Sequence, residues 1–394
     1  MGWNWCVHLA KHCEVYVITE DEFCNPIEAA VPLLEQGRNL HFHYLPVTER
    51  VRRMCWNQGD WRFYYYYKRW QRRAADVARE ICQRERVDVL HQLNMLGFRE
   101  PGYLWQVSKE TGIPFIWGPI GGLMRFPISY AAGEPMKLRA FLRLKNFLNS
   151  WQLKHNTRVE QAFRQASLLF STTPDSYRAI LRCKGLDSII IPDTGTFPRP
   201  ANWFSGQRFL NSQMAILWAG KFDFRKQLGL ALRIIAQAVE DGVNVRLQVF
   251  GSGNDQQRHE ARELSDCLGI ADRVEWRGNC PNREVNEAMQ QADLFLFTSV
   301  SEENSTVVME AISSHLPILC FDACGMSAVV TDDIGRKIAL TNPEQSVKDF
   351  AGKIVYLYHH REELVSMSEN CRERAEQLSW DNKARQVVEL YGKI

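Results

Sequence analysis

LFLFTSVSEENSTVVMEAISSHLPIL, residues 294–319, places an apolar strand, a polar loop, a helix and a second apolar strand in immediate succession. The first strand covers 294–297, the helix begins near Thr306, and the second strand follows Pro317. A strand that leads through a short loop into a helix and then into another strand is typical of a parallel α/β sheet.

The start of this helix offers a site for an anion. Asn304, Ser305 and Thr306 have backbone N–H groups without partners inside the helix, at the positive end of its dipole. Glu302 and Glu310 lie on either side of these groups. Because carboxylates only accept hydrogen bonds, the pattern fits a ligand with a central phosphate and hydroxyl groups at both ends, as in a nucleotide-sugar. The alternative is that the two acids merely favour the helix N-terminus.

The length and composition indicate a globular protein of two domains. The chain has 394 residues, 45% of them hydrophobic and 24% charged, and its formal net charge of +2 gives no global field that would favour nucleic acid. No apolar run reaches the roughly 18 residues that span a bilayer. The 11 cysteines form no CxxC pair and no zinc-type spacing with histidine, so we expect a reducing cytoplasm and no structural metal.

Strands and helices alternate along the chain, which predicts βαβ units and parallel sheets. The expected fold is α/β, with two doubly wound Rossmann-like domains, 1–200 and 201–377, that face a cleft. A linker is expected at 192–213, where the alternation lapses. In the first domain we expect strands at 14–19, 40–45, 87–91, 114–117, 167–171 and 188–191, and helices at 61–85, 99–111, 136–164 and 174–182. In the second domain we expect strands at 215–219, 245–250, 273–277, 294–297, 317–321 and 335–339.

Three further loops of the second domain follow predicted strands and are suited to phosphate. One carries three cations, which would neutralise a leaving diphosphate, and the other two contain glycines that allow a backbone to approach a ligand. Each loop alone is ambiguous, because a solvated basic turn or an ordinary glycine turn gives the same pattern. The residues are Gly220, Lys221, Arg225 and Lys226 in the first loop, Gly251 and Gly253 in the second, and Gly325 and Met326 in the third.

Taken together, these loops resemble the donor domain of the GT-B glycosyltransferases, in particular family 4, the group 1 glycosyltransferases. The Glu-x7-Glu motif of that family falls on Glu302 and Glu310, and its Gly-Arg-x4-Lys loop falls on Gly220, Lys221 and Lys226. Its other motifs match the Gly-x-Gly turn at 251–253, the segment DRVEWRG at 272–278, the segment ADLFLFTSVSE at 292–302 and Leu316-Pro317. The C-terminal segment 378–394 resembles the helix with which the family returns to the first domain.

The resemblance implies a role for each residue of the donor site. Glu310 would hold the ribose hydroxyls, and Glu302 the hydroxyls of the transferred sugar. Lys226, with Lys221 or Arg225, would hold the diphosphate, so that neither a metal nor a cofactor besides the donor substrate is required.

Two departures from the family pattern concern the same site. Glu303 and Asn304 stand where the family usually has Gly-Phe, and Lys221 replaces an arginine, whose planar fork is thereby lost.

The first domain should hold the acceptor. His91 ends one predicted strand, and Gly121 and Gly122 follow the next. Many family members carry a histidine near the second of these positions, where the glycines of this chain would instead let backbone approach the substrate. His91 is therefore a candidate catalytic residue, with a structural core histidine as the alternative.

Two basic, aromatic stretches, 61–73 and 136–158, are also found in the first domain. The second has apolar residues roughly on one helical face and no acid, which is typical of a helix that lies on an anionic membrane. The alternative is a helix that faces the core and has a solvated basic edge.

By resemblance we expect a retaining glycosyltransferase that moves a sugar from a nucleotide diphosphate sugar to a cell-envelope glycan or a lipid-linked acceptor. We expect it to be cytoplasmic and peripheral on the inner face of the plasma membrane, without a nucleic-acid partner. The alternatives are a sugar-nucleotide epimerase of the same fold and a degenerate, non-catalytic nucleotide-sugar binder.

The family also leads us to expect a strand upstream of residue 1. Family members open with a strand and a glycine-rich loop before a helix that resembles Trp3–His12. Without that strand, the strands at 14–19 and 87–91 would each have an unpaired inner edge or would pair directly with each other.

Overall fold

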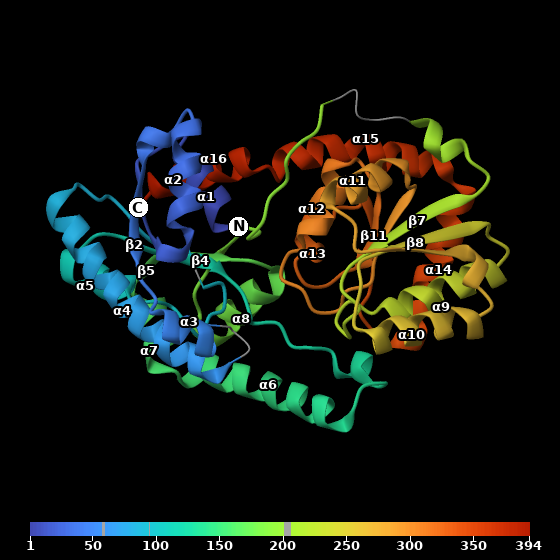
Figure 1. The fold of residues 1–394 in the computed structure, drawn as a ribbon, viewed down its shortest axis with the longest axis horizontal. Coiled ribbons are helices and arrows are strands. Elements are labelled where there is room, and N and C mark those ends of the chain that lie inside the picture. The colour runs from blue at the N-terminus through green and yellow to red at the C-terminus, as the bar shows by residue number, and fades with distance from the viewer. Residues whose placement is uncertain (57–59, 94, 201–205) are drawn as a thin grey trace.

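The computed structural model describes residues 1–56, 60–93, 95–200 and 206–394, so residues 201–205 of the predicted linker lie outside the described part. Two α/β domains lie side by side (Figure 1). The predicted pair of Rossmann-like domains is confirmed.

The second domain contains a parallel sheet of six strands in the order β12-β11-β10-β7-β8-β9, which is a doubly wound arrangement. All its strands begin and end within a few residues of the predicted positions. They are β7 (Met214–Ala219), β8 (Val245–Phe250), β9 (Val274–Gly278), β10 (Leu294–Phe297), β11 (Ile318–Phe321) and β12 (Gly335–Ile338).

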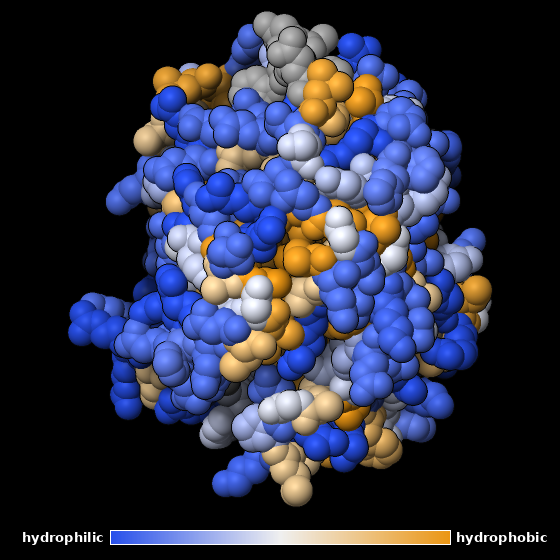
Figure 2. Space-filling model, turned by 90° about the vertical axis from the view of Figure 1, so that its right-hand side faces the viewer, coloured by the Kyte–Doolittle hydropathy of each residue, from blue (hydrophilic) through white to orange (hydrophobic). Residues whose placement is uncertain are grey.

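Helices cover both faces of this sheet, which explains why β10 is a continuous apolar run with all four residues buried. Leu294 and Leu296 pack into a core with α9 and α14, whereas Phe295 and Phe297 pack into a second core with α11, α12 and α15. The surface of this domain is mostly hydrophilic on the side seen in Figure 2, with apolar side chains gathered near its centre. The helices are α9 (Leu228–Glu240), α10 (Asp255–Cys267), α11 (Asn282–Gln291), α12 (Thr306–Ser313), α13 (Met326–Val329), α14 (Pro343–His359) and α15 (Arg361–Gln377).

The sheet of the first domain is divided into two parts. Strand β1 (Val15–Glu20) pairs in parallel with β2 (Leu40–Leu45), and β3 (Leu90–Gln92) begins a separate sheet with the order β3-β4-β5-β6. Among the described strands, β1 does not pair with β3. The alternative in which the strands at 14–19 and 87–91 pair directly with each other is therefore not observed. The remaining strands are β4 (Phe115–Ile120), β5 (Ala166–Ser171) and β6 (Ile189–Ile190).

The prediction of one long helix at 136–164 is wrong, because the chain forms two helices there. The side chain of Asn156 accepts hydrogen bonds from the N–H groups of Arg158 and Val159, so it ends α6 and caps the start of α7. The helices of the first domain are α1 (Gly2–Leu9), α2 (Cys24–Ala30), α3 (Glu49–Cys55), α4 (Trp61–Arg84), α5 (Leu104–Thr111), α6 (Met136–His155), α7 (Thr157–Gln165) and α8 (Pro174–Lys184).

The last helix, α16 (Trp380–Tyr391), packs against α1 of the first domain (Figure 1). The rings of Trp380 and Trp5 meet edge to face at 5.6 Å. The buried Nζ of Lys383 donates to the backbone oxygens of Pro192, at 2.6 Å, and Thr194. The C-terminal helix therefore holds the segment that connects the two domains.

Candidate active site

The loop between β10 and α12 lies against the basic loop that follows β7. The hydroxyl of Thr298 donates to the backbone oxygen of Lys226 at 2.8 Å and accepts from the indole N–H of Trp218 at 3.0 Å. The N–H of Val300 donates to the backbone oxygen of Arg225 at 2.9 Å. These contacts bring the cations of one predicted loop to the acids of the other.

Lys226 and Glu302 form an ion pair, with 2.5 Å between Nζ and Oε2. Both side chains are largely shielded from solvent, with 15% and 25% exposed. The ammonium group also lies 5.2 Å from the centre of the Phe297 ring, a favourable cation–π distance. The sequence therefore placed together two residues that the structure joins directly.

Arg225 and Lys221 extend this basic loop. The Arg225 guanidinium pairs with Asp223 at 2.6 Å, and that hydrogen bond raises the pKa of Arg225 above its ordinary value. Lys221 is exposed. Arg225 is thus held in place before any ligand binds.

The glycine turn after β8 brings loops together within the domain. Gly251 has a φ of 110°, and a Cβ at this position would lie 1.9 Å from the backbone oxygen of Gly220. A Cβ on Gly253 would lie 2.8 Å from the Cβ of Phe222. Gly251 therefore lies against the basic loop, and Gly253 lies against both that loop and Gln257 of α10, whereas the sequence predicted an approach to the ligand.

Glu310 lies in α12, where the carboxylate accepts a hydrogen bond from the side-chain N–H of Asn282 at 2.8 Å. Burial raises the pKa of Glu310 above its usual range. Ser305 precedes this helix without a side-chain capping bond, and the Val308 N–H donates to the Ser305 backbone oxygen at 3.1 Å. Among the described first-turn residues, the amides of Thr306 and Val307 are therefore the ones available to an anion.

Glu303 is the residue whose position the sequence did not reveal. Its carboxylate reaches the first domain, where it accepts hydrogen bonds from the Gly122 N–H and the Thr172 hydroxyl, both at 2.6 Å. A Cβ on Gly121 would lie 2.8 Å from this carboxyl group, so a larger residue there would displace the Glu303 side chain. Burial raises the pKa of Glu303, although its two hydrogen bonds oppose that effect. The family comparison flagged this residue as a departure, which was the available signal.

Asn304 continues the contact between the domains. Its side-chain N–H group donates to Asp193 Oδ1 at 2.7 Å and to the Thr172 backbone oxygen at 3.1 Å. A Cβ on Gly325 would lie 2.1 Å from Asn304 Oδ1, so this turn also packs tightly.

Two residues predicted to face phosphate lie elsewhere. The Gly325 N–H donates to the backbone oxygen of Glu303 at 2.8 Å, so this amide is not available to bind a phosphate. Met326 is buried in the core beside α12. The glycine turn after β11 therefore supports the acidic loop from below rather than forming the anion site.

His91 is placed by its contacts in a structural role, in contrast to the catalytic one expected from the sequence. Its Nε2 donates to the Gly118 backbone oxygen at 2.7 Å, and its Nδ1 accepts from the Tyr391 hydroxyl at 2.6 Å. Burial lowers the pKa of His91 to about 4, so the ring is neutral. Both nitrogens are occupied, and the residue joins β3 to β4 and α16.

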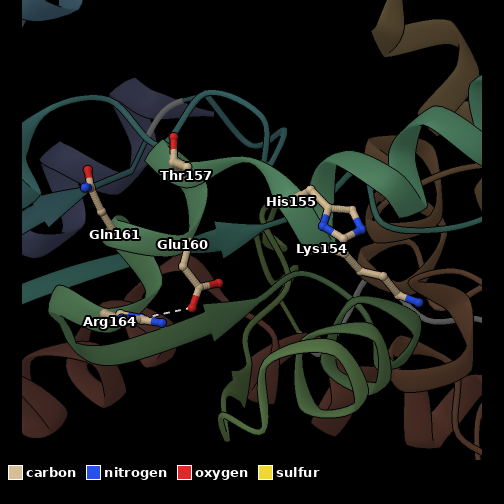
Figure 3. Close-up of a pocket in the computed structure, with 6 residues that line it drawn as sticks. All are labelled: Lys154, His155, Thr157, Glu160, Gln161 and Arg164. Carbon is tan, nitrogen blue, oxygen red and sulfur yellow. Dashed lines mark hydrogen bonds and ion pairs between the residues drawn. The ribbon is translucent and has the colours of Figure 1, made fainter.

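Two surface cavities lie away from these residues. One, of about 370 Å³, is found where α6 meets α7 (Figure 3) and is lined by Lys154, His155, Thr157, Glu160, Gln161 and Arg164. The other, of about 600 Å³, lies between α1 and α16 and is lined by residues that include Lys11, Asp381 and Arg385. Neither is lined by a residue of the predicted donor site.

Comparison with protein families and curated proteins gives partial matches. Residues 202–374 match the family model described as Glycosyl transferases group 1. The D-inositol 3-phosphate glycosyltransferase of Corynebacterium urealyticum is 26% identical over 188 residues, which are 46% of this chain and 44% of that protein. The putative colanic acid biosynthesis glycosyltransferase WcaL of Escherichia coli is 26% identical over 170 residues, 41% of each chain. The chain thus spans less than half the length of these two relatives.

Solved structures match over nearly the whole chain. HepE of Anabaena, in complex with UDP, has a TM-score of 0.60 at 13% identity, with 97% of this chain and all of that chain covered. The lipopolysaccharide outer core galactosyltransferase WaaB, in its apo form, also has a TM-score of 0.60 at 13% identity, with coverage of 96% and 99%. At such identities these matches establish the fold.

Replacement of Glu303 with Gln should change how stability depends on pH. The raised pKa means that the folded protein holds this proton more tightly than the unfolded chain does, so the contribution of Glu303 is greatest below 4.5, its ordinary value. That contribution is lost as the pH rises from 4.5 through the raised pKa, by about 1.4 kcal/mol for each pH unit of the window. The neutral amide has no such loss. In thermal denaturation, the Tm of E303Q relative to that of the wild type should therefore increase as the pH rises.

Glu263→Gln, on the exposed surface of α10, is the matched control and should show no such gain. If the difference in Tm between E303Q and wild type stayed constant from pH 4.5 to 8, the conclusion that this carboxyl group is buried between the domains would be wrong.

Replacement of Tyr391 with Phe should destabilise the protein by about 1–3 kcal/mol, because His91 Nδ1 would remain buried without its donor. Urea denaturation measures the effect, and Tyr356→Phe, at a partly exposed position, is the control. If Y391F instead left stability intact and abolished turnover of the donor, the structural assignment of His91 would be wrong.

Proposed function

Since residues 202–374 belong to the group 1 glycosyltransferases and the chain has the GT-B fold, as its sequence predicted, we propose that this protein transfers a sugar from a nucleoside diphosphate sugar to an acceptor. The donor would bind to the second domain and the acceptor to the first. The proposed reaction retains anomeric configuration, as the sequence resemblance implies.

The observation that carries this proposal is the ion pair of Lys226 and Glu302 beside the start of α12. A diphosphate that leaves the sugar gains negative charge in the transition state, and a preorganised cation stabilises that charge more than it stabilises the ground state. Lys226 is held at the required edge of the sheet by Glu302. When a donor binds, the ammonium group would turn to the phosphate and Glu302 would accept hydrogen bonds from the sugar.

Glu310 supports the same assignment from the other end of the donor. Its carboxylate lies in the first turns of α12, next to backbone amides that can bind the phosphate. A half-buried carboxylate is a strong acceptor for paired ribose hydroxyls. The distance along the loop from Glu302 to Glu310 suits a nucleoside diphosphate sugar extended across the helix start.

We further propose that the reaction requires no metal. Lys226, with Lys221 or Arg225, would supply the positive charge that a magnesium ion would otherwise bring to the diphosphate. Within the described residues, no group of three or more His, Cys, Asp or Glu side chains is arranged to hold a metal ion.

An envelope glycan or a lipid-linked sugar is our proposed acceptor. WcaL is named for colanic acid biosynthesis, and TuaC of Bacillus subtilis, 40% identical over 52 residues, for teichuronic acid biosynthesis. Because these relatives match only in part, they support the class of acceptor and no particular linkage.

Helix α6 supports attachment to a membrane, which would suit such an acceptor. The alternative of a core-facing apolar stripe is contradicted, because the apolar side chains of this helix are mostly exposed. Cations flank them, and the helix carries no acid, so the surface complements anionic lipid. In the described part of the chain, no helix has the length and apolarity to cross a membrane. The exposed apolar residues are Met136, Phe141, Leu144, Phe147, Leu148 and Trp151.

A panel of UDP-, GDP-, ADP- and dTDP-hexoses should reveal the donor by thermal shift, since a ligand at 100 times its Kd adds about 2.7 kcal/mol of stability. Replacement of Glu310 with Gln should weaken binding of that donor about tenfold, because an amide replaces the ribose-holding carboxylate. Lys226→Ala should instead lower kcat about 100-fold or more, through loss of charge stabilisation in the transition state. Release of nucleoside diphosphate measures kcat.

Lys348→Ala, at an exposed position of α14, is the control for both variants and should behave as wild type. Wild-type binding and turnover in both E310Q and K226A would show that the donor site lies elsewhere. A donor that is altered without any acceptor, by epimerisation, would replace transfer as the function.

The double replacement of Phe147 and Trp151 with Ser should reduce co-sedimentation with anionic vesicles about tenfold or more, because two exposed apolar anchors are lost. Binding of the wild type should fall as salt is added. The control is Leu210→Ser, which changes an exposed leucine of the second domain. Equal co-sedimentation of both variants would argue against membrane attachment through α6. Wild-type binding that does not depend on lipid charge or on salt would do the same.

A further inference from the structure

Three cations from both domains converge beside the proposed donor site. In the first domain, the guanidinium of Arg99 contacts Asn149 Oδ1 in α6. Lys145 lies one helical turn before Asn149, and residues four positions apart share a helix face. Arg99 and Lys145 therefore occupy the same side of α6, the side that bears the buried Asn149 and lies opposite the exposed Phe147 and Trp151.

Contacts of the neighbouring residues bring this part of α6 to the basic loop of the second domain. The side chain of Asn146 donates to the Phe126 backbone oxygen and accepts from its N–H, both at 3.0 Å. The ring of Phe126 packs against that of Phe224, with 5.3 Å between their centres. Arg225 follows Phe224 directly, so α6 lies beside the loop that carries Arg225.

The electrostatics agree with that geometry. Partial burial, and then the charges of Arg99 and Arg225, lower the pKa of Lys145. Two acids next to the cluster are engaged: Asp223 pairs with Arg225, and Glu100 pairs with Arg158. Asp223 offsets part of the charge of Arg225, but Arg99 and Arg225 still repel Lys145, and a bound anion would relieve that repulsion.

We propose that Arg99, Lys145 and Arg225 form an anion subsite that binds a phosphate group of the acceptor. This inference rests on the proposed function and extends it from the donor to the acceptor. Two of the cations belong to the first domain, where the acceptor binds, and the third precedes Lys226, which pairs with Glu302 at the sugar. Three donor groups from separate directions match the several oxygens of a phosphate better than the two of a carboxylate.

The test uses the full chain saturated with the nucleoside diphosphate that stabilises it most, so that the donor phosphate site is filled. Isothermal titration then compares glucose 1-phosphate, dodecyl phosphate below its micellar concentration, glucuronate and uncharged methyl α-glucoside. We expect binding of at least one of the two phosphate probes, and binding of glucuronate and methyl α-glucoside that is at least about tenfold weaker. Tighter binding of dodecyl phosphate points to a lipid-linked phosphate, and tighter binding of glucose 1-phosphate to a soluble sugar phosphate.

Lys145→Met should raise the Kd for the phosphate probe about tenfold, while the Kd for the nucleoside diphosphate stays within about twofold. Arg99→Lys keeps the charge but loses the fork, so its Kd should fall between those of wild type and K145M. Arg143→Met, at an exposed position on the opposite side of α6, is the control for general charge attraction and should bind as wild type.

Wild-type affinity of K145M for the phosphate probes, an equal loss in R143M, or equal affinity for glucuronate would each overturn the subsite. These outcomes leave the proposed function standing if the nucleoside diphosphate binds. If no nucleoside diphosphate binds, the proposed function fails, and titration of the phosphate probes into the free chain still shows whether Lys145 and Arg99 hold an anion.

Discussion

The contact of Glu303 with Gly122 and Thr172 fixes how the two domains meet at the proposed site. Burial of a carboxylate between domains costs several kcal/mol unless hydrogen bonds and nearby charge compensate. Here an N–H and a hydroxyl compensate only in part, because the pKa of Glu303 remains raised. A contact of this kind orients the domains, and separation of the domains would return the carboxylate to water, which offsets part of the loss of its two hydrogen bonds.

The adjacent residues of one loop thereby serve both domains. Glu302 pairs with Lys226 inside the second domain, whereas Glu303 and Asn304 bind the first. Because the backbone joins these side chains, separation of the domains would pull on the loop that holds Glu302. Asp193, the partner of Asn304, lies between the two carbonyl groups that Lys383 binds from α16, so the connecting segment is held from both sides.

The sequence was sufficient for the features that depend on neighbours along the chain. The alternation of apolar runs and helical lengths predicted the second sheet. The resemblance to the group 1 glycosyltransferases assigned Lys226 and Glu302 to one site, and the structure joins them in an ion pair. Contacts between distant segments that no family motif marks were not predictable. Glu303 meets Gly122 across 181 positions, and His91 meets Tyr391 across 300, so neither pairing leaves a local signal.

Helix α6 shows a second limit of the sequence. A stripe of apolar residues at helical spacing does not indicate whether that face of the helix lies against the core or in solvent. The structure decides this through the residues that are buried, Leu142, Asn149 and Leu153, which lie on one face. With 100° between successive residues, Phe147 and Trp151 fall on the opposite face, while Lys145 stays close to Asn149. One helix therefore turns an apolar side outward and carries an exposed cation next to its buried face. A phosphate that links a sugar to a lipid has a charged group next to an apolar chain, so it would use both sides of this helix, whereas a soluble sugar phosphate would use only the cation.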